Sequence, residues 1–84
     1  LHQYALDEVR TRIIEMEQRV QHWEEKYGCS YDLFVHRTTT DEAFVKQLEA
    51  DSEKQMWEGD QLSWEFDVEE LHEWRRHLQK LLTG

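Results

Sequence analysis

The sequence predicts an all-α protein in which two long helices form an antiparallel hairpin joined by short helices. Three observations support this fold class. The 84 residues include no proline and only three glycines, and 35% of them are charged, a composition typical of helices. Apolar residues recur at helical spacing towards both ends of the chain. A turn signal separates these two regions. Residues 1–84 are therefore expected to form a single helical domain.

The first long helix is predicted over about residues 2–27. Its apolar residues are separated by alternating steps of three and four, which places them along one face of a helix. Ile14 widens this face, so the helix is expected to pack against more than one neighbour. The face consists of Leu6, Val9, Ile13, Met16, Val20, Trp23 and Tyr27.

The run KYGCS at residues 26–30 predicts the end of this helix and the start of another. Gly28 supplies the left-handed backbone position that commonly follows a helix. Ser30 is a favourable N-cap, and Asp32 follows in the first turn, where a negative charge is stabilising. The chain is therefore expected to turn back on itself.

One or two short helices are predicted over about residues 30–50. The first is a short amphipathic turn, which the run Thr38–Thr40 is expected to break. Thr39 and Glu42 match a capping box, in which each side chain bonds the other residue's backbone N–H, and this predicts a second short helix. The apolar residues of these two elements are Leu33, Phe34, Val35, Phe44, Val45 and Leu48.

The last long helix is predicted over about residues 52–82, because Ser52 and Gln55 match a second capping box. Alternatively, a single bent helix runs from Asp41 onward, and Gly59–Asp60 is a further candidate break. The apolar faces of the two long helices are expected to bury each other. The face of the last helix consists of Trp57, Trp64, Val68, Leu71, Leu78 and Leu82, widened by Phe66, Trp74 and Leu81.

Both long helices carry wider apolar faces than a hairpin of two helices can bury. We therefore expect a homodimer in which two hairpins form a four-helix bundle, with one of the long helices near the two-fold axis. A different protein is the alternative cover for these faces. The residues expected to mediate self-association are Leu6, Val9, Ile13, Met16, Val20, Trp23, Leu71 and Leu78.

The net charge of −9 is concentrated in residues 41–70, which carry eleven acidic and two basic residues. Such a surface repels nucleic acid, so direct binding of DNA or RNA is not expected. It attracts basic proteins, and aromatic side chains in the same segment are suitable anchors for an interface. The residues expected to bind a basic partner are Glu49, Asp51, Glu53, Trp57, Glu58, Trp64 and Phe66.

The sequence also indicates where the protein works. No apolar run approaches the roughly 18 residues that a membrane-spanning helix needs, and no signal-peptide pattern opens the chain. The single cysteine, Cys29, excludes an internal disulfide and is compatible with a reducing compartment. A cytoplasmic location without membrane contact is therefore expected.

Three groups of residues have spacings known from catalytic or metal sites, and each has a simpler interpretation. Glu69 and His72 have the spacing of ferritin-like metal ligands, but they flank the apolar stripe and are expected on a solvated surface. Glu24 and Glu25 are similar to the acidic residues that hold magnesium in all-α nucleotide pyrophosphohydrolases, but no matching second motif follows. Cys29 has no histidine near it in sequence, so a packed thiol is expected. No metal, cofactor or catalytic residue is predicted.

Two motifs resemble those of small acidic helical antitoxins, which are encoded beside toxin genes. The first is KYGCS at residues 26–30 followed by Phe34, and the second is WEF at residues 64–66 ahead of a terminal amphipathic helix. The resemblance implies a protein that neutralises a basic toxin, often a ribonuclease, by occupying its active surface. The chain departs from the pattern of many antitoxins because no DNA-binding module is visible, so self-repression is not implied.

These observations lead to three hypotheses of function. The first is a non-catalytic interaction protein whose acidic segment binds a basic partner, as an antitoxin does. The second is a self-associating helical scaffold or regulatory protein with no toxin involved. The third is an all-α metal- or nucleotide-dependent enzyme, for which the chain lacks a complete set of acidic motifs.

Overall fold

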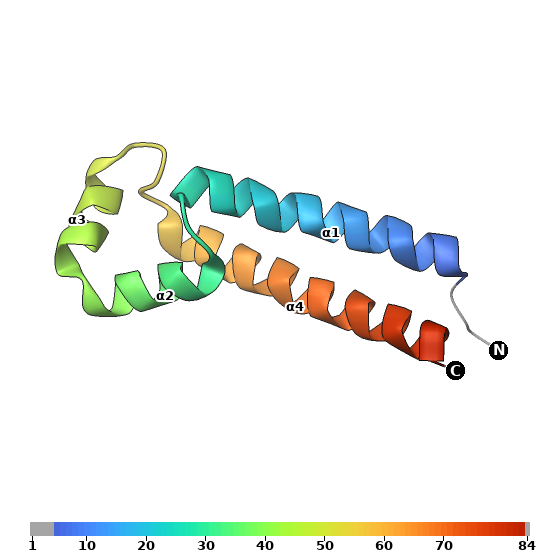
Figure 1. The fold of residues 1–84 in the computed structure, drawn as a ribbon. Helices are drawn as coiled ribbons and strands as arrows, with labels where there is room; N and C mark the ends of the chain where they lie inside the picture. The colour runs from blue at the N-terminus through green and yellow to red at the C-terminus, as the bar shows by residue number, and fades with distance from the viewer. Residues whose placement is uncertain (1–4, 84) are drawn as a thin grey trace.

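The computed structural model describes residues 5–83 and contains four α-helices, with no strand in this range. They are α1 (Leu6–Tyr27), α2 (Tyr31–Thr40), α3 (Glu42–Ala50) and α4 (Trp57–Thr83). Helices α1 and α4 lie antiparallel as a hairpin, and α2 and α3 lie at its closed end (Figure 1). The all-α class and the hairpin are therefore confirmed. Residues 2–4 of the predicted first helix lie outside the described residues.

The hairpin is elongated, with extents of 50 × 22 × 18 Å. Helix α1 has 22 residues and α4 has 27, which correspond to lengths of about 33 and 40 Å at the helical rise. Because α2 and α3 occupy the closed end, the open end of the hairpin consists, among residues 5–83, of the start of α1 and the end of α4 (Figure 1). The two ends therefore differ in how well they can bury apolar side chains.

The turn between α1 and α2 has the geometry that the sequence predicts. Gly28 adopts a left-handed conformation with φ of 71°, and its N–H donates to the carbonyl oxygen of Glu24 at 2.7 Å. The Ser30 hydroxyl oxygen accepts from the N–H of Leu33 at 3.3 Å, which caps α2. The end of α1 and the reversal of the chain are therefore confirmed.

Replacing Gly28 by alanine should destabilise the protein by about 1 kcal/mol, because a Cβ disfavours the left-handed conformation. No atom lies within 4 Å of the new Cβ, so the effect is one of backbone strain. Gly59 is the matched control, since it lies within α4 and also has open space around it. Gly59→Ala should stabilise the protein by about 0.5–1 kcal/mol. Urea unfolding of both variants measures these changes, and destabilisation by Gly59→Ala alone would contradict the assignment.

The boundary between the two short helices differs from the prediction. The run Thr38–Thr40 belongs to α2, and the hydroxyl of Thr39 donates to the carbonyl of Val35 at 2.7 Å. Threonine is compatible with a helix when its hydroxyl bonds a carbonyl of the preceding turn. Asp41 caps α3, with its carboxylate accepting from the N–H of Phe44 at 3.1 Å. The predicted capping box of Thr39 and Glu42 is therefore wrong.

The start of the last long helix also differs. Turns occupy residues 51–56, and α4 begins at Trp57 rather than near residue 52. The side chain of Asp51 accepts from the N–H of Glu53 at 2.9 Å, so this carboxylate supports a turn where a capping box of Ser52 and Gln55 was predicted. Neither a single helix from Asp41 nor a break at Gly59–Asp60 is present, because α4 is continuous through residues 59 and 60.

The core of the closed end is an aromatic cluster. Its buried members are Tyr27, Phe34, Leu48 and Trp64, one from each helix, and the fully buried Phe34 and Trp64 rings have centroids 5.2 Å apart. Aromatic rings remove large apolar areas from water and stabilise one another at such distances. The turn therefore places Tyr27 and Phe34 on either side of Gly28, where both contact Trp64.

Asp60 connects the end of α1 to the start of α4 beside this cluster. Its Oδ2 accepts from the Lys26 ammonium at 2.8 Å and from the Tyr27 hydroxyl at 2.5 Å. Burial acts to raise the pKa of Asp60, but the hydrogen bonds from Lys26 and Tyr27 and the Lys26 charge outweigh it and lower that pKa. Burial and the contact with Asp60 together raise the pKa of Tyr27 above its ordinary range.

The Asp60 contacts predict a loss of stability in acid. A carboxyl group with a lowered pKa stabilises the folded state fully above the unfolded-state pKa of about 4, and this contribution is lost progressively as the pH falls from there through the lower folded-state pKa. Asp60→Asn should therefore cost about 1–2 kcal/mol at pH 7, and the difference from wild type should shrink towards pH 3. Urea unfolding at both pH values measures it. An equal difference at the two pH values would contradict a role for the charge.

The open half of the hairpin is less completely buried than the closed end. Val9, Met16 and Leu71 are buried, whereas Leu6 is 37% exposed, so the expectation that Leu6 is buried by α4 is wrong for the single chain. The other predicted face residues Ile13, Val20, Trp23, Val68 and Leu78 are half-buried. The exposed apolar residues of this half include Leu6, Ile14, Leu81 and Leu82. Pairing of two hairpins would cover such residues.

Within residues 5–83, no helix has an apolar stretch sufficient to cross a bilayer. The longest helix, α4, carries charged side chains along most of its length from Glu58 to Lys80. The expectation that the chain has no membrane-spanning helix therefore holds for the part that the structure describes.

Candidate partner-binding groove

A row of exposed side chains follows the side of α4 that faces away from the core. Near its middle, Leu62 and Phe66 are 69% and 58% exposed and lie one helical turn apart, so their side chains form adjacent apolar surface. Acidic residues lie before, between and after them along the same side. We refer to this row as the α4 outer stripe, which consists of Glu58, Leu62, Glu65, Phe66, Glu69 and Glu73.

The acidic residues of the stripe are mostly without a basic neighbour. Within residues 5–83, none of Glu58, Glu65 and Glu69 forms an ion pair with a lysine or an arginine. Glu73 pairs with Arg76 at 2.9 Å on the same helix. The stripe therefore combines exposed apolar surface with uncompensated negative charge.

An open groove of about 850 Å³ adjoins the stripe and runs between α1 and α4. Leu62 and Phe66 belong to both the stripe and the groove, so the two features form one continuous surface. Trp23 and Asp67 also line it, one from each long helix. The complete lining is Glu15, Gln18, Arg19, His22, Trp23, Leu62, Ser63, Phe66 and Asp67.

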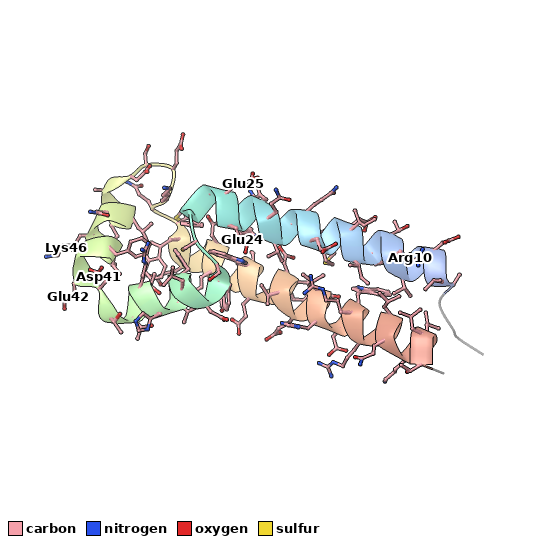
Figure 2. The ribbon with its side chains drawn as sticks, viewed as in Figure 1. Arg10, Glu24, Glu25, Asp41, Glu42 and Lys46 are labelled. Carbon is pink, nitrogen blue, oxygen red and sulfur yellow. The ribbon has the colours of Figure 1, made fainter. Side chains whose placement is uncertain are left out.

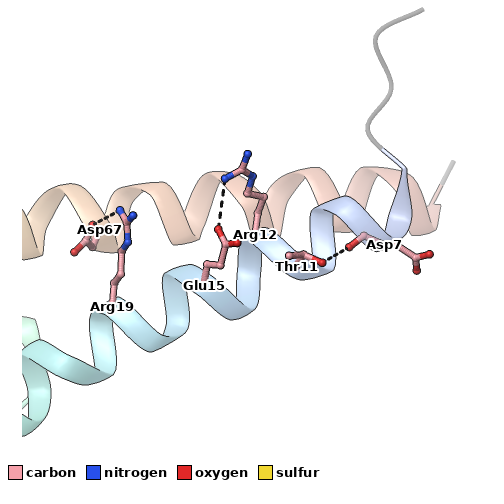
Figure 3. Close-up of polar contacts among 6 residues, drawn as sticks. All are labelled: Asp7, Thr11, Arg12, Glu15, Arg19 and Asp67. Carbon is pink, nitrogen blue, oxygen red and sulfur yellow. Dashed lines mark hydrogen bonds and ion pairs between the residues drawn. The ribbon is translucent and has the colours of Figure 1, made fainter.

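Asp67 is a buried carboxylate in this groove. Its Oδ2 accepts from the indole Nε1–H of Trp23 at 2.9 Å, which connects α4 to α1. Its Oδ1 lies 3.8 Å from a guanidinium nitrogen of Arg19, which reaches across from α1 (Figure 3). The Asp67 side chain is 10% exposed and that of Arg19 is 60% exposed. The buried carboxylate therefore has one firm hydrogen bond and one long ion pair.

The aromatic residues predicted to bind a partner differ in how exposed they are in the structure. Trp64 has no exposed surface, so it belongs to the core and has no surface for a partner, contrary to the prediction. Trp57 is half-buried and packs edge-on against Phe34, with ring centroids 6.2 Å apart. Phe66 is exposed on the stripe, as a contact residue must be.

The acidic residues predicted to bind a partner lie in two separate places in the structure. Glu58 lies on the α4 outer stripe. Glu49, near the end of α3, and Glu53, in the following turn, are exposed at the closed end, where Figure 2 shows α3 with Asp41, Glu42 and Lys46. Asp51 is half-buried, and its carboxylate supports the turn before α4. Glu49, Asp51 and Glu53 therefore do not line the groove.

A second, more polar groove lies on the other side of the hairpin and contains two of the residues considered for chemistry. Glu24 and His72 line it, and Arg75 spans it to Glu17 at 3.4 Å. Glu25 lies on a different side of α1 from Glu24 (Figure 2) and accepts from Gln21 at 3.1 Å. Glu69 is on the α4 outer stripe. No group of three or more potential metal ligands is present among residues 5–83.

Cys29 packs against the aromatic cluster and is half-buried. Burial raises the pKa of its thiol, which outweighs the opposing effect of Arg37, so the reactive thiolate is disfavoured. This environment agrees with the expected packed thiol.

Two features of the groove were not predicted from the sequence. Leu62 is absent from the predicted contact residues, although its spacing of four from both Glu58 and Phe66 shows that these three residues share a side of the helix. The contact between Trp23 and Asp67 joins residues 44 positions apart and has no local sequence signal. Comparison with protein families, curated proteins and solved structures finds no match to the chain.

Proposed function

We propose that this chain is a non-catalytic interaction protein that binds a basic protein through the α4 outer stripe and the adjoining groove. The observation that carries the proposal is the exposure of Leu62 and Phe66 among acidic residues of which, within residues 5–83, only Glu73 forms an ion pair with a lysine or an arginine. Exposed aromatic and aliphatic anchors supply much of the binding energy of protein interfaces. Surrounding charge of one sign speeds encounter with an oppositely charged partner and disfavours other partners.

The most specific form of the proposal is an antitoxin-like role, in which the basic partner is a ribonuclease-type toxin encoded by a neighbouring reading frame. The motifs at residues 26–30 and 64–66 support it, as does the acidic surface. A ribonuclease binds a polyanion, so its active surface is basic and is complementary in charge to the α4 outer stripe. The cytoplasm is the compartment in which such a pair would meet.

Co-expression tests this proposal directly. The neighbouring reading frame should encode a basic protein that arrests growth, and this chain should relieve the arrest when both are expressed. A variant with Phe66 replaced by aspartate should fail to do so while remaining folded, because Phe66 is exposed and outside the core. Absence of a complex between the two purified proteins would refute the antitoxin role.

Self-association is a second candidate function, favoured by the open half of the hairpin. The surface area of 6382 Å² exceeds by about 1,000 Å² the roughly 5,400 Å² expected for a folded chain of 10.4 kDa. A standard interface covers about 800 Å² on each partner. A dimeric four-helix bundle through Leu6, Ile14, Leu81 and Leu82 would therefore cover exposed apolar surface while leaving the α4 outer stripe in solvent.

Sedimentation equilibrium measures this association. The expected result at micromolar concentration is a mass twice that of the 10.4 kDa chain, with Leu82→Glu weakening the dimer because the leucine is 66% exposed near the end of α4. A monomer at these concentrations, with unfolding that does not depend on protein concentration, would exclude the dimer.

A further inference from the structure

The groove holds the Asp67 carboxylate, and only one of its two oxygens accepts a close hydrogen bond from another side chain of the described residues. Oδ2 of Asp67 accepts from Trp23 at 2.9 Å. The nearest cation to Oδ1 among the described residues is Arg19, at 3.8 Å, which is beyond hydrogen-bonding distance. Buried carboxylates ordinarily accept close, charge-assisted hydrogen bonds. Asp67 therefore offers an acceptor at the floor of an open groove.

The walls of the groove suit one kind of cation. Trp23 and Phe66 supply aromatic surface and Leu62 supplies aliphatic surface around the carboxylate. A guanidinium group is planar, with hydrogen-bond donors at its edge and weakly hydrated faces that stack on aromatic rings. A lysine ammonium lacks such faces and is more strongly hydrated. The combination of an acidic floor and aromatic walls therefore favours arginine over lysine.

Arg19 can be displaced from Asp67 by an arginine of a bound partner. Arg19 is 60% exposed and holds Asp67 only at long range. Glu15 lies four residues before Arg19 on α1 and lines the same groove, a spacing that allows an ion pair within the helix. Glu15 forms an ion pair with Arg12 at 3.4 Å, and both side chains of this pair are about half exposed (Figure 3). Arg19 therefore keeps an alternative partner if it leaves Asp67.

We propose that the groove between α1 and α4 receives an arginine side chain of the basic partner, whose guanidinium bonds Oδ1 of Asp67 and stacks against Trp23 and Phe66. The proposal rests on the proposed function and specifies how the partner is anchored. With two carboxylates and one arginine among its lining residues, and histidine neutral, the groove carries a net charge of −2 + 1 = −1, which favours an added cation. The arginine would occupy the place where Arg19 now points.

The test uses two synthetic amphipathic helical peptides whose basic residues are lysines except at one central position. That position is arginine in one peptide and citrulline, its neutral isostere, in the other. The Trp23 indole N–H resonance reports directly on Asp67, because the two groups are hydrogen-bonded. The arginine peptide should shift this resonance and bind at least tenfold more tightly than the citrulline peptide. Equal affinities of the two peptides for the wild-type chain would overturn the proposal.

Two variants assign the effect to Asp67. In Asp67→Asn, which keeps an acceptor for Trp23, the two peptides should bind within threefold of each other. In Arg19→Gln, which removes the competing cation at an exposed position, the arginine peptide should bind severalfold more tightly than to wild type. An unchanged arginine preference in Asp67→Asn, or weaker binding in Arg19→Gln, would contradict the assignment.

The outcomes distinguish a failure of the arginine-binding proposal from a failure of the proposed function. If both peptides bind equally and Phe66→Asp weakens both, the α4 outer stripe is the interface and the arginine anchor is wrong. If neither peptide binds, or if Phe66→Asp changes neither affinity, the proposed function is contradicted as well.

Discussion

Replacing Phe34 by alanine should destabilise the protein by about 3–5 kcal/mol, since the ring is fully buried and the cavity cannot easily collapse. Its ring contacts those of Tyr27, Phe44, Trp57 and Trp64, with centroids 4.7 to 6.2 Å apart. These four rings belong to the other three helices, α1, α3 and α4. Small domains have a total stability near the lower end of 5–15 kcal/mol. Loss of this one ring should therefore remove most of the folding free energy.

Phe66→Ala is the matched control for Phe34→Ala, because it removes the same side chain from an exposed position. Its stability should stay within about 0.5 kcal/mol of wild type. Thermal unfolding followed by circular dichroism should show a midpoint lowered by more than about 15 °C for Phe34→Ala and almost unchanged for Phe66→Ala. Similar midpoints for the two variants would contradict the placement of the core.

The ends of the helices could be predicted from the sequence where a single residue determines them. Gly28 and Ser30 have unambiguous roles in ending one helix and starting the next, and both are present as predicted. The predicted capping boxes are absent because Asp41 and Asp51 accept from other backbone N–H groups, those of Phe44 and Glu53. Where several neighbouring polar residues could each cap a helix, the backbone conformation decides which one does, and sequence spacing does not specify that conformation.

The surface of α4 was harder to predict than its length. Phe66 follows the buried Trp64 by two residues, so a helical rotation of about 200° places it on the opposite side. Both residues were predicted for the apolar face because their side chains are apolar, and both were also predicted for the partner surface because they lie in an acidic segment. Composition suggested the interacting segment, but only the helical geometry separates its core residues from its exposed ones.

The groove depends on packing and could not be predicted. Trp23 and Asp67 face each other because α1 and α4 pack at one particular register, which is set by the aromatic cluster at the closed end. Asp67 lies three residues after Trp64 and four before Leu71, on the same side of α4, but the sequence does not show which residue of α1 it meets. The site therefore combines a stripe that the sequence encodes locally with a carboxylate that only the hairpin brings to it.

Reversing three charges on the α4 outer stripe should have the largest effect on partner binding. Changing Glu58, Glu65 and Glu69 to lysine replaces attraction by repulsion at three exposed positions around Leu62 and Phe66. Each reversed pair is expected to contribute about 1 kcal/mol, so affinity should fall by about 100-fold. Stability should change little because all three side chains are exposed.

The matched control reverses three exposed acids elsewhere, namely Glu25, Glu49 and Glu53. Each triple variant changes six charges, so the net charge of −9 becomes −3 in both. A difference between the two variants therefore depends on position and not on overall charge. The control variant also tests whether the closed end takes part in binding, as the acidic segment alone suggested.

The most direct measurement is calorimetric titration of the proposed basic partner with wild type and both triple variants, at low and high salt. We predict that the stripe variant loses about 100-fold in affinity and most of the salt dependence, while the control variant stays within about threefold of wild type and keeps its salt dependence. Equal losses in the two variants, or an unchanged affinity of the stripe variant, would contradict the assignment of the α4 outer stripe as the binding surface.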